Sequence, residues 1–422
     1  MSRRPLCVQR LFTALAVLGA LVLAPRAGQG AEGTDADAEK DWPSVILKLR
    51  QQLERTSGLA ATRRQLAVAY NNYGVNLSNQ GRITDAIQQL EEAVRLDPGN
   101  SQVRTNLARV QLQAAQAAYQ INQFQEAREI LDRVLALDPK SAEAYFLIGE
   151  IAYHNQNLKE AKAAWQQAMA LNPSFEPAKE QLGRLEQELP IESKFERLSQ
   201  FNFDLRYTNG LDRSAGYDIR DALLDARRTI GSDFAYWPKQ KTVVLVYSAQ
   251  QFRQLRKEMP DWVAGQYDGK IRVPLPGADL DRNTVTRTLR HEYTHALVHD
   301  LTHDRLPTWF NEGLAEYEGW KGSNSQWLML RQAMGSRTVI PWGKLSEQFS
   351  TTLAAPTVLL AYEQSHNIVR YLVDRYGFWR IRRILKAVDD GVPLEDALVR
   401  ECRTKLGNLE RDWQKSLDDT LR

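Results

Sequence analysis

The sequence predicts a multidomain fold in which an all-α array of helical repeats precedes an α+β domain, and three observations support it. A string of small and apolar residues recurs between about residues 67 and 173. Beyond residue 190 the pattern changes to short alternating runs and then to long helical stripes. The length of 422 residues also exceeds what a single hydrophobic core usually organises.

The first 30 residues have a character of their own. Three arginines precede an apolar run at residues 11–24, which is too short to cross a bilayer comfortably as a helix. This order is typical of a signal peptide, with Gly28 and Gly30 as the small residues before cleavage at Ala31. An uncleaved anchor or a short buried helix is the alternative. We therefore expect export to the periplasm or the exterior of a bacterium, with no membrane span after cleavage.

The net charge of the mature chain differs from that of the whole sequence. Residues 1–30 hold four arginines and no acidic residue, so the basic residues fall from 55 to 51 against 52 acidic ones. The formal charge of +3 thus becomes about −1, and no nucleic-acid partner is expected. Cys402 would be the only remaining cysteine, so an internal disulfide is excluded.

Residues 31–42 are small, charged and aperiodic, which predicts a disordered lead. A Leu- and Gln-rich helix is expected at residues 43–54. Together these segments form a lead and N-terminal helix at residues 31–66, ahead of the repeats.

The repeat string occurs in three copies. The positions are Tyr70, Tyr73, Gly74, Leu77, Ala86, Leu90, Ala93 and Pro98, then Ala115, Ala118, Ala127, Leu131, Val134 and Pro139, then Tyr145, Ile148, Gly149, Ala152, Ala161, Trp165, Ala168 and Pro173. They resemble the tetratricopeptide repeat, which is a pair of antiparallel helices of 34 residues. The third interval is 34 residues and the second is 41, so the first helix of the middle copy should carry about two extra turns.

A capping helix is expected at residues 174–188, and Leu189 and Pro190 mark the predicted end of the repeat region at residues 67–190. Such arrays usually bind a peptide or a protein partner on their concave face. A spacer or a clamp on the neighbouring domain is the alternative, and the sequence leaves both open.

Residues 191–422 form the predicted α+β domain. Strands are expected at residues 201–207, 241–247 and 270–275, with an amphipathic helix at 217–229. In the third strand Ile271, Val273 and Leu275 share one face, and Lys270 and Arg272 share the other. After residue 283 the pattern is helical throughout.

The segment from Leu289 to Leu297 holds the residues that carry chemistry. On a helix, His291 and His295 lie one turn apart on nearly the same face, where two imidazoles can hold one metal ion. Glu292 projects beside this position, so it can take a proton from a water activated by the metal and pass it to the departing amine. The pattern predicts a hydrolytic zinc site.

A second helical segment, TWFNEGLAEY at residues 308–317, makes the pattern resemble the gluzincin metallopeptidases, such as thermolysin and aminopeptidase N. The resemblance implies that Glu312, 17 residues after His295, is the third ligand of a single Zn²⁺ ion. It also implies that Glu316 orients one ligand histidine and that Asn311 orients the other. Three protein ligands leave a fourth position for water, as catalytic zinc requires.

Two other metal sites do not fit. A metzincin would need glycine at Val298 and histidine at Leu301. A closed structural site is unattractive because no cysteine is near and Glu292 would have no purpose. His299 and His303 continue the four-residue spacing, but their direction drifts away from His291.

Gluzincins also supply a donor for the oxyanion that forms during hydrolysis. In aminopeptidase N this is a tyrosine before Glu-Lys-Gly on a later helix, and the resemblance places Tyr362, followed by Glu363, in that role. A core aromatic is the alternative for Tyr362. His366 is a further accessory candidate, for which a packed or surface histidine is preferred.

Overall, residues 192–420 resemble bacterial peptidase MA-like domains, which often accompany tetratricopeptide repeats. The predicted fold is thus an all-α tetratricopeptide-repeat solenoid followed by an α+β gluzincin-type domain, with a peptide or protein as substrate. Residues 267–274 stand where aminopeptidases carry an acid-rich edge strand, and they lack such an element. A repeat-based scaffold with a non-catalytic zinc domain, or a zinc hydrolase of a non-protein amide, remains an alternative.

Overall fold

The computed structural model describes residues 41–55, 60–199, 202–209, 213–256, 265–275, 282–322, 327–350 and 353–421. The predicted signal peptide and nearly all of the predicted disordered lead lie outside these residues. The chain divides into two compact units, of which the first ends at Glu186 and the second begins at Gln187. We call them the N-terminal and the C-terminal unit.

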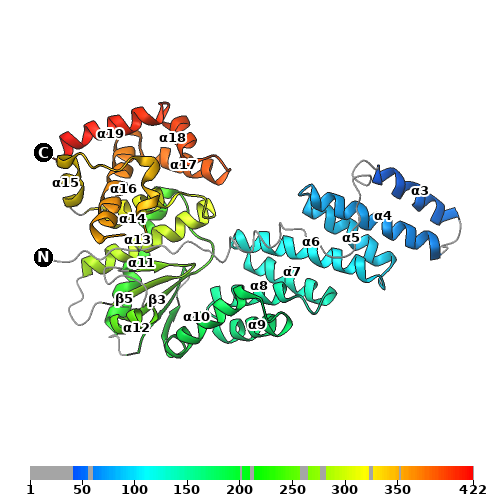
Figure 1. The fold of residues 1–422 in the computed structure, drawn as a ribbon. Coiled ribbons are helices and arrows are strands. Elements are labelled where there is room, and N and C mark those ends of the chain that lie inside the picture. Colours follow the sequence, from blue (N-terminus) through cyan, green and yellow to red (C-terminus); the bar gives the residue numbers. More distant parts are fainter. Residues whose placement is uncertain are drawn as a thin grey trace. The chain divides into compact units, whose positions relative to one another are not determined.

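The N-terminal unit is entirely helical in its described residues (Figure 1). Its helices are α3 (Trp42–Arg55), α4 (Ala60–Asn79), α5 (Ile83–Leu96), α6 (Ser101–Gln120), α7 (Phe124–Leu137), α8 (Ala142–His154) and α9 (Leu158–Leu171). The pairs α4–α5, α6–α7 and α8–α9 pack together, which confirms the three predicted repeats. Helix α6 has 20 residues and α8 has 13, so the two extra turns are present. The first repeat begins at Ala60, earlier than the predicted residue 67.

Small residues let the paired helices approach closely. A Cβ atom at Gly74 would lie 2.6 Å from Leu90 Cγ, so α4 and α5 touch where only glycine leaves room. In the third repeat Gly149 packs against the Trp165 ring, whose Nε1 donates to the Phe146 carbonyl at 3.2 Å. These contacts explain why the sequence pattern alternates small with large side chains.

Helix α10 (Glu176–Glu192) follows the repeats and corrects the predicted boundary. The helix continues through Pro190, which lies in its last turn, where a missing N–H costs little. Glu188 and Glu192, one turn apart, are buried and form ion pairs with Arg272. Tertiary ion pairs therefore hold the last turn in place, and the sequence around Pro190 does not show them.

The C-terminal unit contains a five-stranded sheet in the order β1-β2-β3-β5-β4. The strands are β1 (Glu196–Ser199), β2 (Phe203–Tyr207), β3 (Thr242–Ser248), β4 (Gln266–Tyr267) and β5 (Ile271–Leu275). Strands β2, β3 and β5 run parallel, while β1 and β4 are antiparallel to their neighbours. The predicted strand at residues 267–274 is therefore wrong, because a turn separates the edge strand β4 from the inner strand β5.

Each face of the sheet has its own core. On one face Val244, Val246, Ile271 and Val273 pack against α11 (Arg213–Phe234) and α13 (Arg282–Thr302). On the other face Val243, Leu245 and Tyr247 pack with Phe252 of α12 (Ala249–Leu255). Lys270 and Arg272 are almost completely buried, so the charged face of the predicted strand does not lie in solvent.

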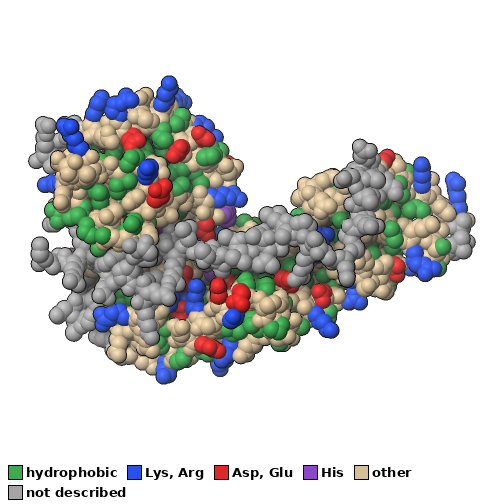
Figure 2. All heavy atoms as spheres, in the orientation of Figure 1, with side chains coloured by type: hydrophobic (Ala, Val, Ile, Leu, Met, Phe, Trp, Pro, Cys, Tyr) green, Lys and Arg blue, Asp and Glu red, His purple; other side chains and the backbone are tan. Residues whose placement is uncertain are grey.

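Helices fill the rest of the C-terminal unit, as predicted. They are α14 (Thr308–Trp320), α15 (Leu328–Ser336), the 3₁₀ turns η1 (Trp342–Lys344) and η2 (Ser346–Gln348), α16 (Ala355–Tyr376), α17 (Phe378–Asp389), α18 (Leu394–Cys402) and α19 (Leu406–Leu421). Among the described helices, none is long and apolar enough to cross a membrane. Side chains of both charge signs occur on the visible surface of each unit (Figure 2).

Candidate metal centre

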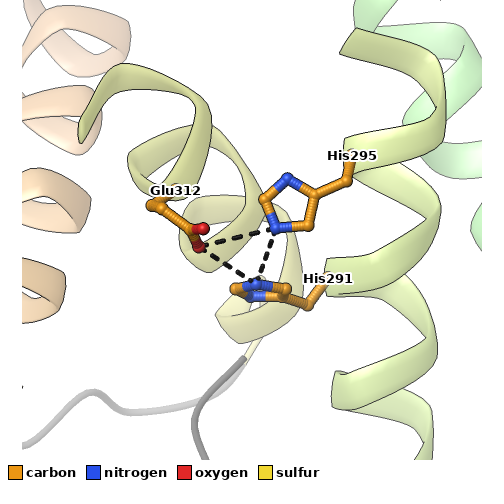
Figure 3. Close-up of side chains that lie close together, drawn as sticks. All are labelled: His291, His295 and Glu312. Carbon is orange, nitrogen blue, oxygen red and sulfur yellow. Dashed lines mark hydrogen bonds and ion pairs between the residues drawn. The ribbon is translucent and has the colours of Figure 1, made fainter. Parts of the chain in front are cut away.

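Helices α13 and α14 pack side by side and present the predicted site residues to each other (Figure 3). Leu289, Tyr293 and Leu297 bury the apolar stripe of α13 in the main core. Phe310 and Leu314 do the same for α14. The polar residues of the motif therefore face the space between the two helices, where burial fixes their rotamers.

His291, His295 and Glu312 converge on one point. The Nε2 atoms of the two histidines are 3.1 Å apart, and Glu312 Oε2 lies 3.4 Å from His291 Nε2 and 3.5 Å from His295 Nε2. All three residues are buried, and among the described residues their ligand atoms lie within 4.8 Å of one another. The structure thus brings together the three residues that the sequence predicts as ligands.

Each histidine is held by a second polar group on α14. Glu316 Oε1 lies 3.1 Å from His291 Nδ1, and Asn311 Oδ1 lies 3.0 Å from His295 Nδ1. Both oxygens accept hydrogen bonds, so each Nδ1 carries a proton and each Nε2 can turn a lone pair toward Glu312. Glu316 and Asn311 therefore stand where the sequence predicts the orienting groups.

The charges of the site favour a cation between the histidines. Burial lowers the pKa of His291, but hydrogen bonds with Glu312 and Glu316 outweigh it and raise that pKa to about 10. Burial raises the pKa of Glu312, but His295 and His291 outweigh it and lower that pKa to about 2. Two facing Nε2 lone pairs repel each other unless a proton or a metal ion lies between them.

The donor set fits zinc in both chemistry and spacing. Two imidazole nitrogens and one carboxylate oxygen are ligands that Zn²⁺ prefers. Bonds of about 2.0–2.1 Å to a tetrahedral ion place its ligand atoms about 3.3 Å apart. The three observed separations of 3.1, 3.4 and 3.5 Å match that spacing. The described residues could therefore hold a tetrahedral ion without rearranging.

Glu292 is fully buried beside the histidines, and its charge helps to raise the pKa of His291. The backbone at Gly265, just before β4, lies against its side chain. A Cβ atom at that position would stand 2.9 Å from Glu292 Cδ. The sequence does not predict this contact, although an isolated glycine beside a strand is typical of a close backbone approach.

Tyr362 and His366 lie one turn apart on α16, which packs against α14. Tyr362 is buried in a small cluster with Val358, and its ring lies 4.9 Å from that of Phe349. His366 is buried as well, with its ring 4.6 Å from that of Trp327. Its charge helps to lower the pKa of Glu316, so His366 lies within electrostatic reach of the group that holds His291.

Two further histidines of α13 and its following turn bind carboxylates elsewhere. His299 Nδ1 lies 2.8 Å from Asp304, and His303 Nδ1 lies 2.8 Å from Asp389. Both pairings agree with the expectation that these residues point away from His291.

Arg290 links the two helices of the site, and no sequence motif indicates this role. Its Nε donates to the Glu318 carbonyl at 2.8 Å, and its Nη1 donates to Thr229 of α11 at 2.8 Å. Its Nη2 also lies 3.3 Å from Glu318 Oε2. The residue next to His291 thus ties α13 to α14 and α11, which fixes the spacing of the ligands.

Known proteins resemble the N-terminal part in sequence and structure. Stress-induced-phosphoprotein 1 of Caenorhabditis elegans is 26% identical over 135 residues, or 32% of this chain, and the match spans 40% of that protein's length. The first TPR of Spaghetti (RPAP3), solved with an HSP90 peptide, is 24% identical, with 30% of this chain and 95% of that chain covered and a TM-score of 0.23. For the crystal structure of MamA the values are 20%, 39%, 87% and 0.25.

Two family models match separate parts of the chain. Residues 34–178 match the cytochrome c-type biogenesis protein H TPR domain, and residues 239–419 match the Peptidase MA superfamily. The second match includes both helices of the metal centre and most of the sheet. The chain therefore combines a tetratricopeptide-repeat region with a domain of the Peptidase MA superfamily.

Proposed function

We propose that the C-terminal unit is a zinc-dependent peptidase and that His291, His295 and Glu312 bind one Zn²⁺ ion. The observation that carries the proposal is the convergence of these three buried donors, at tetrahedral spacing, beside the buried carboxylate Glu292. A structural zinc site has no use for such a carboxylate, whereas hydrolysis requires a base at that place.

The zinc ion would supply Lewis-acid chemistry, because it polarises a carbonyl and lowers the pKa of water. Glu292 takes the proton of the attacking water and delivers it to the leaving amine. Glu316 and Asn311 keep the two imidazoles oriented through their Nδ1 protons. Tyr362 donates a hydrogen bond to the oxyanion of the tetrahedral state, as the resemblance to gluzincins implies.

The substrate we propose is a peptide in extended conformation. Strand β4 forms an edge of the sheet and begins next to Glu292. A peptide that pairs with this edge would pass its backbone across the metal centre, and main-chain hydrogen bonds would hold it with little dependence on sequence.

We also propose export of the chain and binding of a protein partner by the repeat region. Support for export comes from residues 1–30, whose arginines and apolar run are those of a signal peptide. Mass spectrometry of the protein from its native envelope should find a chain that starts near Ala31. An intact N-terminus in a cytosolic fraction would contradict export.

The test of the function is cleavage of a diverse peptide library by the purified mature chain. We expect cleavage that stops on chelation and returns with added zinc, and no bound metal in the double variant His291→Ala, His295→Ala. Native protein without metal would contradict the zinc site. A scaffold would retain zinc and bind a partner through residues 67–173 without cleaving any peptide, and a hydrolase of another amide would cleave only non-peptide substrates.

A further inference from the structure

A glycine lies against the side chain that the proposed function makes the general base. Gly265 is buried, and a Cβ atom there would stand 2.9 Å from Glu292 Cδ and 3.1 Å from Cγ, and nearer still to Oε1. Its φ is not positive, unlike that of Gly269, so the backbone conformation does not require glycine. Close approach to Glu292 is the reason why no side chain fits.

The strand that follows Gly265 is held on its other side by Arg256. Gln266 is buried, and its Oε1 accepts a hydrogen bond from Arg256 Nε at 2.7 Å. The Nη2 atom of the same guanidinium lies 3.2 Å from Glu188 Oε1 on α10. Gln266 is thus anchored to α10 through one arginine.

A second arginine holds the end of β4. Arg272 is completely buried, and its Nε donates to the Asp268 carboxylate at 3.2 Å. Its Nη1 lies 2.6 Å from Glu192 Oε1, which also accepts a hydrogen bond from Tyr247 at 2.6 Å. Both ends of the β4 region therefore connect by buried ion pairs to the last two turns of α10.

Buried ion pairs are a poor source of stability, because desolvation offsets most of the attraction. They do fix geometry, since each guanidinium accepts only a few arrangements of its carboxylates. A network of two arginines and three carboxylates around a two-residue strand is well suited to hold that strand at one distance from its neighbours.

We propose that β4 is a positioning element for Glu292: the Gly265 backbone confines the carboxylate, and the pairs of Arg256 and Arg272 with α10 hold the strand against it. The inference rests on the proposed function, because confinement matters only if Glu292 must meet a water and a leaving amine in one geometry. Gly265 is then a positioning residue that touches no substrate.

The test is a double-mutant cycle between Gly265 and Glu292. Gly265→Ala adds a methyl group at the carboxylate and should lower kcat by about 10²-fold, the loss expected from a misplacement on the order of 1 Å, with little change in KM. Glu292→Asp shortens the side chain and makes room. In the Glu292→Asp background, Gly265→Ala should therefore change kcat by less than about threefold.

The same cycle has a readout that needs no activity. Gly265→Ala should lower the Tm of the metal-free protein by about 2–4 °C, and Glu292→Asp should remove this loss. Zinc content should equal that of the wild type in all three variants. Gly335→Ala is the matched control, because a Cβ atom there meets nothing within 4 Å and both kcat and Tm should stay near wild type.

The network is tested by Arg256→Met, which releases Gln266 and leaves Glu188 its pair with Arg272. We expect a several-fold lower kcat with unchanged zinc content. Unchanged kcat in Gly265→Ala, with an active wild type and an inactive Glu292→Gln, would overturn this inference alone. An inactive wild type would overturn the proposed function and this inference with it.

Discussion

Glu316 Oε1 lies 3.1 Å from His291 Nδ1, one helical turn beyond Glu312 on the same helix. Helix α14 thus supplies a metal ligand and, four residues later, the group that orients a ligand on α13. Because both come from one rigid element, the orientation of His291 and the position of Glu312 cannot vary independently.

Loss of this orienting contact should weaken metal binding. Glu316→Ala removes the acceptor for His291 Nδ1, and we expect zinc affinity to fall by about 10–100-fold. The dissociation constant is measured by competition with a chromophoric chelator. Glu395→Ala, at an exposed position of α18, is the control and should bind zinc as the wild type does. Equal affinity in the two variants would show that Glu316 does not orient the ligand.

Glu318 should make stability depend on pH. Burial and Asp233 raise its pKa to about 7, although Lys321 and Arg290 oppose them. The unfolded chain has a glutamate pKa near 4.3, so the folded state holds the proton more tightly and stability falls as pH rises from about 4.3 to 7. Glu318→Gln keeps the neutral form at every pH. We expect the loss of unfolding free energy between pH 5 and pH 8 to shrink by roughly 1–3 kcal/mol in this variant.

Urea denaturation of metal-free wild type and Glu318→Gln at both pH values checks this. If both proteins lose the same unfolding free energy over that range, Glu318 is not the protonated group.

The close approach in the first repeat should be sensitive to one methyl group. Gly74→Ala places a Cβ atom 2.6 Å from Leu90 Cγ and 3.1 Å from the Ala86 carbonyl oxygen. Overpacking costs about 1–3 kcal/mol and exceeds the gain of about 1 kcal/mol from alanine in a helix. The melting transition of the repeat region should move down by several degrees. Gly183→Ala, where the added atom meets nothing within 4 Å, should leave it unchanged or raise it.

Tyr362→Phe tests the oxyanion donor. The change removes one hydroxyl and keeps the ring against Phe349, so folding should be preserved. If Tyr362 donates to the oxyanion, kcat should fall by roughly 10² with little change in KM. Tyr217→Phe, at an exposed tyrosine of α11, is the matched control. A kcat equal to that of the control would make Tyr362 a core aromatic.

Local patterns in the sequence predict most of the fold and the grouping of the ligands. The four-residue spacing of His291 and His295 is a property of one helix, and the small residues of the repeats define their helix pairs. These features depend on neighbours close in sequence. The resemblance to gluzincins supplies Glu312, which follows His295 by only one turn and the start of a helix.

Contacts between distant segments are what the sequence does not show. Lys270 and Arg272 alternate like the exposed face of a strand, yet Glu188 and Glu192 cover that face and pair with Arg272. The same pairs carry α10 past Pro190. The proximity of Gly265 to Glu292 depends on the packing of β4 against α13, and no spacing in the chain encodes it.

The central claim, that this unit is a zinc peptidase with Glu292 as its base, is tested most directly by Glu292→Gln. The substitution removes the carboxylate charge, keeps nearly the same shape and touches no predicted ligand. We predict that kcat/KM for peptide cleavage falls by about 10² to 10⁴ or more, while zinc content and Tm stay near wild type. Cleavage by the variant at the wild-type rate, with zinc still bound, would contradict the account.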